Sequence, residues 1–199
     1  MGAIFQSLGR TIAAGVVVLI VLLIVLVAAG AKVPVGEHAW WVFAMRWLHV
    51  TAGVMWIGLL WYFNFVQTPS MPKIPDDQKP AVSKVIAPAA LFWFRWAAMA
   101  TIILGLLLAL MNGYLVPALT LQKPFTSIGI GAWLGTIMWA NVWFVIWPNQ
   151  KKALGIVTVE AAEKAAAAKR AGMASRINTM LSIPMLYFMV AQSHGGLAF

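Results

Sequence analysis

The chain has 199 residues, of which 62% are hydrophobic and only 10% charged, and its mean hydropathy of +0.87 excludes an ordinary soluble domain. The formal net charge of +9 does not indicate a nucleic-acid partner, because the basic residues lie between apolar segments, where they set orientation in the lipid bilayer. Cysteine is absent, which excludes disulfides, iron–sulfur clusters and covalent c-type haem attachment.

The apolar segments predict an all-α fold, an integral membrane helical bundle with about five transmembrane helices in one domain, residues 1–199. Each segment is long enough to cross a bilayer. The predicted spans, in chain order, are about 11–30, 39–66, 86–112, 127–147 and 177–194. The first is apolar without interruption over 16–27 and is expected to be an uncleaved anchor at the periphery of the bundle.

The connections between the spans carry the turn and surface signals. Pro69, Pro72 and Pro75 are expected to end the second helix. The alanine-rich stretch over about 157–171 predicts a helix on the cytoplasmic surface, because Ala, Glu and Lys favour helix and Gly172 follows as a stop signal.

Orientation follows from the distribution of lysine and arginine. The two sides of the predicted membrane spans differ greatly in the number of basic residues that they hold. On one side lie only Lys32 and Lys123, and on the other lie Arg10, Lys73, Lys79, Lys84, Lys151, Lys152, Lys164, Lys169, Arg170 and Arg176. Because positive loops stay in the cytoplasm, we expect a bacterial inner-membrane protein with a cytoplasmic N-terminus and a periplasmic C-terminus.

The second span contains an arginine and a histidine three residues apart, Arg46 and His49. Ionisable groups at bilayer depth are costly and mark functional sites. Gly53 and Trp56 follow on the same helical stripe, so that a small residue lies one turn from the histidine and an aromatic ring lies beyond it. This pattern suits haem b held by an imidazole in a helix bundle. Structural packing and direct proton transfer remain alternative roles for His49.

A second axial ligand would be His194 or His38, and His194 is the better placed because it ends a helix. The methionines at positions 45, 55, 185 and 189 are further candidates, although methionine in a span is more often packing. Arg95, between Trp93 and Trp96, is expected either to bind an anion, a haem propionate or a quinone head group, or to extend toward the cytoplasmic surface.

A small metal site near the predicted outer face is a weaker hypothesis. Glu37, His38 and His194 would supply two imidazoles and a carboxylate from different segments. Solvated loop residues are the favoured interpretation of these three side chains.

The motif Arg46-Trp-Leu-His49-Val-Thr-Ala-Gly53-Val-Met-Trp56-Ile-Gly58-Leu-Leu-Trp-Tyr62-Phe63 resembles the helix motif of the membrane domain of bacterial membrane-bound urate oxidases, or urate hydroxylases. Later segments are similar to that family in the same order: Trp93-Phe-Arg95-Trp96, Asn141-Val-Trp-Phe-Val-Ile-Trp-Pro148-Asn149-Gln150-Lys151-Lys152, and Ser175-Arg-Ile-Asn178-Thr-Met-Leu-Ser182-Ile-Pro184. The histidine motif also resembles membrane haem proteins of protoporphyrinogen oxidation and copper resistance.

The resemblance implies an oxidoreductase-type membrane protein with haem b-linked electron transfer through His49. Arg46 and Arg95 would neutralise propionates or an anionic substrate, and a cytochrome c or a larger membrane redox complex would exchange electrons with the chain. The alternative is an accessory subunit without a cofactor, packed against a respiratory or photosynthetic membrane complex through its first helix and tryptophan-rich faces.

Overall fold

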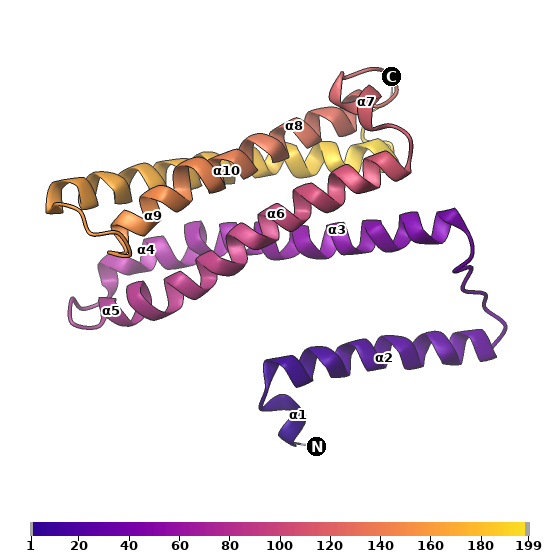
Figure 1. Ribbon diagram of the computed structural model, residues 1–199, viewed down its shortest axis with the longest axis horizontal. Coiled ribbons are helices and arrows are strands. Elements are labelled where there is room, and N and C mark those ends of the chain that lie inside the picture. Colours follow the sequence, from indigo (N-terminus) through magenta and orange to yellow (C-terminus); the bar gives the residue numbers. More distant parts are fainter. Residues whose placement is uncertain (1, 198–199) are drawn as a thin grey trace. The chain divides into compact units, whose positions relative to one another are not determined.

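The computed structural model describes residues 2–197 of the chain (Figure 1). Every regular element in this range is a helix, so the predicted all-α fold class is confirmed. The chain divides into two compact units, residues 1–41 and residues 42–199.

The first unit is dominated by one apolar helix. Helix α1 (Gly2–Phe5) is short, and α2 (Leu8–Ala28) begins after Ser7, whose backbone is extended. Because none of the residues of α2 is buried, the helix presents its apolar side chains on all sides. A helix with this composition and length is suited to lipid, and α2 meets the length and composition expected of a membrane span.

The second unit is built from two antiparallel helical hairpins (Figure 1). In the first, α3 (His38–Trp61) continues through the π-helix η1 (Tyr62–Gln67), α4 (Thr68–Ser70) and the 3₁₀ turn η2 (Met71–Lys73). The chain returns through α5 (Lys79–Ala81), the π-helix η3 (Val82–Ile86) and α6 (Ala87–Met111). The short α7 (Leu115–Leu119) connects this hairpin to the second.

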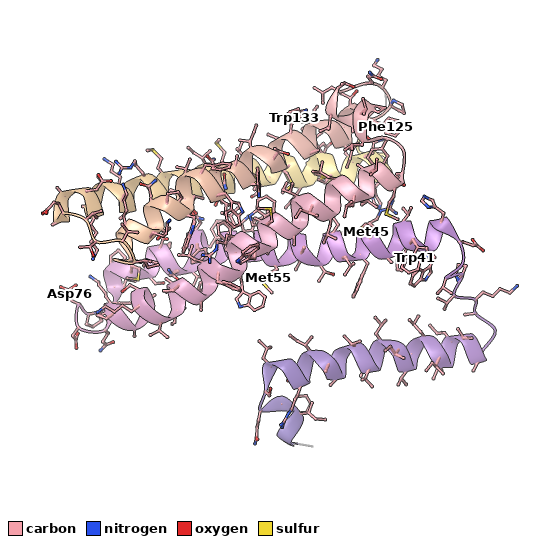
Figure 2. All side chains as sticks on the ribbon, in the orientation of Figure 1. Trp41, Met45, Met55, Asp76, Phe125 and Trp133 are labelled. Atoms are coloured by element: carbon pink, nitrogen blue, oxygen red, sulfur yellow. The ribbon has the colours of Figure 1, made fainter. Side chains whose placement is uncertain are left out.

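The second hairpin pairs α8 with the longest helix of the chain. Helix α8 (Thr126–Ala140) continues through the π-helix η4 (Asn141–Ile146) into α9 (Trp147–Ala153), and α10 (Ala161–His194) returns along it. The short helices α4, α5 and α9 therefore lie at one end of the unit and α7 lies at the other (Figure 1). Asp76 marks the first end, and Phe125 and Trp133 mark the second (Figure 2).

A proline follows each of the three π-helical segments by two residues. Gln67, Ile86 and Ile146 end these segments, and prolines stand at positions 69, 88 and 148. Proline has no N–H and its ring clashes with the carbonyl four residues earlier, which in each case lies inside the π segment. Widening the turn accommodates the proline without ending the helix, which is why the second helical run continues past Pro69 to Lys73 rather than stopping near residue 66.

Helix α10 replaces the surface helix and the fifth span that we predicted separately. It runs from Ala161 to His194 without a break at Gly172, and it also contains Pro184. A glycine inside a helix costs only about 1 kcal/mol, which the surrounding alanines and the packing of α10 on α9 offset. Four helical runs are long and apolar enough to cross a membrane in the described residues, namely 8–28, 38–73, 79–111 and 126–153, and α10 is not among them.

The core of the second unit is apolar and contains a small number of buried amides and hydroxyls. Trp56, Leu60 and Phe94 are almost completely buried, and Met138 and Val142 of the second hairpin pack with them. Asn178 is completely buried, where its Nδ2 donates to the Met138 carbonyl and its Oδ1 accepts from Asn141 Nδ2, both at 2.9 Å. These bonds satisfy the buried amide and tie α10 to α8 and η4.

Candidate functional site

His49 lies half-buried on α3 and faces α6. Its ring Nδ1 is 2.9 Å from the backbone carbonyl oxygen of Thr101. A carbonyl only accepts hydrogen bonds, so Nδ1 carries the hydrogen and donates. Nε2 is then the unprotonated nitrogen, and it makes no hydrogen bond with any residue in the described range 2–197. A backbone bond that fixes one ring nitrogen and leaves the other as a lone pair is the usual arrangement of a ligating histidine.

The small residue that accommodates the imidazole is Gly105 of α6. A Cβ at position 105 would lie 2.9 Å from His49 Cε1 and 3.1 Å from Nδ1, so only glycine allows the ring to lie against this turn of α6. Gly53, which we predicted to provide this gap, has more room: its added Cβ would meet Thr101 Cγ2 at 3.9 Å, an ordinary contact. The close approach beside His49 therefore comes from the facing helix.

The predicted arginines lie on different sides of His49. Arg46, one turn earlier on α3, is exposed, and its charge acts on Tyr114 at the α7 end. Burial raises the pKa of Tyr114, and the positive charge of Arg46 partly opposes that rise. Arg95 lies six residues before Thr101, about 9 Å along α6 toward α9 at ~1.5 Å per residue. The structure does not bring the two arginines together around the histidine.

Arg95 instead stacks on aromatic rings at the α9 end. Its Cζ is 3.8 Å from the ring centroid of Trp147 and 5.5 Å from that of Phe92. Lys151 approaches the same Trp147 ring at 5.8 Å. Cation–π contacts of this kind stabilise a guanidinium without a carboxylate. Of the two flanking tryptophans that we considered, Trp93 is exposed and Trp96 packs edge-on against Trp143.

The remaining predicted ligands lie in other environments. Trp56 is a core side chain, 1% exposed, whose Nε1 has no hydrogen-bond partner among the described residues. His194 is exposed at the end of α10, where its Nδ1 is 3.1 Å from the carbonyl of Val190 in the same helix. Met185 is buried in the core, while Met45 is half-buried and Met55 exposed along α3 (Figure 2).

The described residues contain no cluster of side chains that could hold a metal ion. Within residues 2–197, no three His, Cys, Asp or Glu side chains lie close enough together to hold a metal ion. Haem ligation needs an axial donor, and the Nε2 of His49, which has no hydrogen-bond partner among the described residues, is a donor of the required type. Within the described residues, no hydrogen bond joins His49 to His194.

Sequence reasoning missed the partners of His49 and Arg95. Thr101 and Gly105 are spaced by four residues on α6, the small-xxx-small pattern that lets two membrane helices approach closely. That pattern was a usable signal, although it does not say which helix will face it. Trp147 could not be assigned to Arg95 because the two residues lie on different hairpins.

The comparisons with known proteins concern the second hairpin. Residues 125–199 match the family model described as the N-terminal domain of urate oxidase. Searches of curated proteins and of solved structures found no match. The matched range contains the two segments with Asn141 and Asn178, whereas His49 and Arg95 lie outside it. By this hairpin, which is less than half of the chain, the sequence is similar to the N-terminal part of urate oxidase.

Proposed function

We propose that this chain is a membrane redox protein related to urate oxidase, which binds haem b through His49 and takes part in electron transfer. The single observation that carries the proposal is the hydrogen bond from His49 Nδ1 to Thr101, because it fixes the ring and leaves Nε2 as a lone pair for an iron ligand. The similarity of residues 125–199 to the N-terminal part of urate oxidase supports the choice of a redox class.

In this proposal each residue has a limited task. His49 supplies the axial donor, Thr101 orients the ring, and Gly105 keeps the space beside the ring small enough to hold it. Arg46, one turn away and exposed, provides a positive charge for an anionic group on the same side. Haem b supplies one-electron chemistry when bound, and a cytochrome c or a larger membrane redox complex would exchange the electrons.

A reduced-minus-oxidised spectrum tests the haem proposal. The full chain, purified in mild detergent from cells supplied with a haem precursor, should show the visible bands of haem b after dithionite reduction. We expect His49→Ala to lose the bands, because the axial donor is gone, and His38→Ala to keep them. Thermal unfolding of His49→Ala should be cooperative, so that a lost band reports ligation rather than misfolding.

Two results would contradict haem ligation by His49. One is the absence of any haem band in folded wild-type protein. The other is an unchanged band in the His49→Ala protein. A spectrum that shifts without loss in His194→Ala would identify His194 as the second ligand, and an unchanged one would exclude it.

A second candidate function is that of an accessory subunit without a cofactor. It is favoured by α2, none of whose residues is buried and which is therefore available to helices of another protein. A stoichiometric complex that is lost when residues 1–30 are deleted, while the free chain carries no pigment, would support it. If every partner stayed bound after residues 1–30 were deleted, that result would count against the accessory-subunit function.

We also propose the inner membrane as the location, with the α4, α5 and α9 end of the second unit in the cytoplasm. The support is the concentration of basic residues at that end, since lysines 73, 79, 84, 151 and 152 all belong to its helices.

A further inference from the structure

A cavity of about 270 Å³ lies at the α4, α5 and α9 end of the second unit. It is distinct from the surroundings of His49, because neither the histidine nor its neighbours Thr101 and Gly105 line it. All three π-helical segments contribute to its wall, through residues of η1, η3 and η4, and α10 closes it. Wide π turns recur at functional sites in helical proteins. The volume is close to the lower limit for small-molecule sites.

The floor of the cavity is apolar and aromatic. Phe63 and Phe94, from η1 and α6, pack edge to face with ring centroids 5.7 Å apart, and both line the cavity. Such a surface favours the flat, apolar body of a ligand.

The wall toward α10 offers hydrogen-bond donors. Ser175 Oγ accepts a hydrogen bond from Asn64 Nδ2 at 2.8 Å, which leaves the hydroxyl hydrogen of Ser175 to donate. Arg176, the next residue, also lines the cavity. It forms no ion pair within residues 2–197, and it is the one charged side chain among the described residues of the lining. A carboxylate is the group that these two donors recognise.

The wall toward η1 holds an acceptor without a donor. Gln67 Oε1 is buried and has no hydrogen-bond partner among the described residues. An unpaired buried acceptor is costly, so a ligand that brings a hydroxyl to this oxygen gains more than the bond alone. The Gln67 acceptor and the Arg176 donor lie on different elements of the same cavity.

We propose that this cavity binds a small hydroxylated aromatic monocarboxylate. The carboxylate binds Arg176 and the Ser175 hydroxyl, the ring lies on Phe63 and Phe94, and the hydroxyl donates to Gln67 Oε1. The site is independent of the haem proposal. The carboxylate ligand binds away from His49, and its binding is measured in the same way whether or not the protein contains haem.

Isothermal titration of the full chain in detergent at pH 7 tests the ligand class. The probes are 4-hydroxybenzoate, benzoate and 4-hydroxybenzyl alcohol, each also titrated into empty micelles. We expect saturable binding of 4-hydroxybenzoate, and binding at least about tenfold weaker for benzoate, which lacks the hydroxyl, and for the alcohol, which lacks the charge.

Variants assign the two ends of the ligand. Arg176→Gln should weaken 4-hydroxybenzoate at least about tenfold and leave the uncharged alcohol unchanged. Lys169→Gln is the matched control, because it removes the same charge from an exposed position of α10 outside the cavity and should have no effect. Gln67→Leu should remove the preference for 4-hydroxybenzoate over benzoate. Since it deletes an unpaired acceptor, this variant should fold as well as wild type.

The proposal is overturned by several outcomes. One is equal affinity of wild-type protein for benzoate and 4-hydroxybenzoate, and another is no saturable heat beyond that of empty micelles. A third is an Arg176→Gln protein that folds with an unchanged midpoint and binds 4-hydroxybenzoate as tightly as the wild type.

Discussion

At the residue scale, His49 shows how a polar side chain within a long apolar helix is accommodated against a neighbouring helix. Its Nδ1 donates to a backbone carbonyl that lies within helix α6, so the imidazole is oriented without a charged partner. The contact requires α6 to approach α3 closely at one turn, and Gly105 is the residue that permits it. A ring held in this way has a fixed tautomer, which matters both for ligation and for simple packing.

The glycine contact gives a prediction about stability. Gly105→Ala places a Cβ 2.9 Å from His49 Cε1, so the ring must move and its bond to Thr101 is strained or lost. We expect a loss of about 1–3 kcal/mol in the free energy of unfolding. Chemical unfolding in mixed micelles, followed by tryptophan fluorescence, measures it.

Gly53→Ala is the matched control for that measurement. The nearest atom to its added Cβ is 3.9 Å away, so no contact is overpacked and the alanine only improves helix propensity. We expect a neutral effect or a gain of up to about 1 kcal/mol. If Gly105→Ala were as stable as Gly53→Ala, the close packing of the imidazole on α6 would be refuted.

At the scale of elements, prolines widen turns inside the helices, and ion pairs fix the start of α10. Three prolines follow π segments without ending their helices, and the wide turns that result surround the cavity. Glu163, in the first turn of α10, ties the start of this helix to α9 and to the third turn of α10. One of its carboxylate oxygens accepts from Lys152 Nζ at 2.8 Å and from an Arg170 guanidinium nitrogen at 2.7 Å.

The Glu163 network predicts a pH dependence of stability. The hydrogen bond from Lys152, aided by the charges of Lys152 and Arg170, holds the pKa of Glu163 below its ordinary value of 4.5. The folded state therefore binds this proton more weakly than the unfolded chain. Its stabilisation is fully present above pH 4.5 and is lost as the pH falls through the lower folded-state pKa.

Thermal unfolding of wild-type and Glu163→Gln protein between pH 3 and pH 8 checks this. We expect Glu163→Gln to unfold at a lower temperature at neutral pH and the difference to disappear in acid. Added salt should narrow the gap, because the pairs are partly exposed. Glu160→Gln, which removes a carboxylate without an ion pair in the described residues, should show no such pH dependence.

Local reasoning succeeded for the elements and failed at their boundaries. The apolar runs identified the four helical runs that are long and apolar enough to cross a membrane, because hydrophobicity and length are local properties of the sequence. The longest helix, α10, was instead predicted as two separate elements. Local reasoning placed helix ends at Pro69 and Gly172, yet the helices continue through both. A π turn accommodates Pro69, and packing on a neighbouring helix offsets the cost of Gly172. Neither effect is visible in a short window of sequence.

At the scale of the whole molecule, the distribution of charge is the main physical constraint. The loop between η2 and α5, where Asp76 lies, belongs to the lysine-rich end of the second unit, and the loop before Phe125 belongs to the other end (Figure 2). The run 79–111 connects these loops and is apolar enough to cross a membrane. The proposed orientation therefore separates the two loops by a bilayer.

The absence of natural cysteine allows a direct test of that orientation. The variants Asp77→Cys and Gln122→Cys each place a single cysteine at an exposed loop position, one at each end of the second unit. In spheroplasts, a membrane-impermeant maleimide should label Gln122→Cys at once and Asp77→Cys only after lysis. The reverse pattern would invert the orientation, and labelling of both in intact spheroplasts would contradict a membrane span between them.

The sequence by itself determined that this is a helical protein suited to a membrane, and it identified His49, Arg46 and Arg95 as ionisable residues within long apolar segments. These conclusions depend on composition and on the cost of burying charge, which are fixed by each segment alone. Only the tertiary structure decided that His49 meets Thr101, that Arg95 stacks on Trp147, and that three π turns surround one cavity. Such pairings depend on which helix faces each residue, and that is determined by packing between helices far apart in the chain.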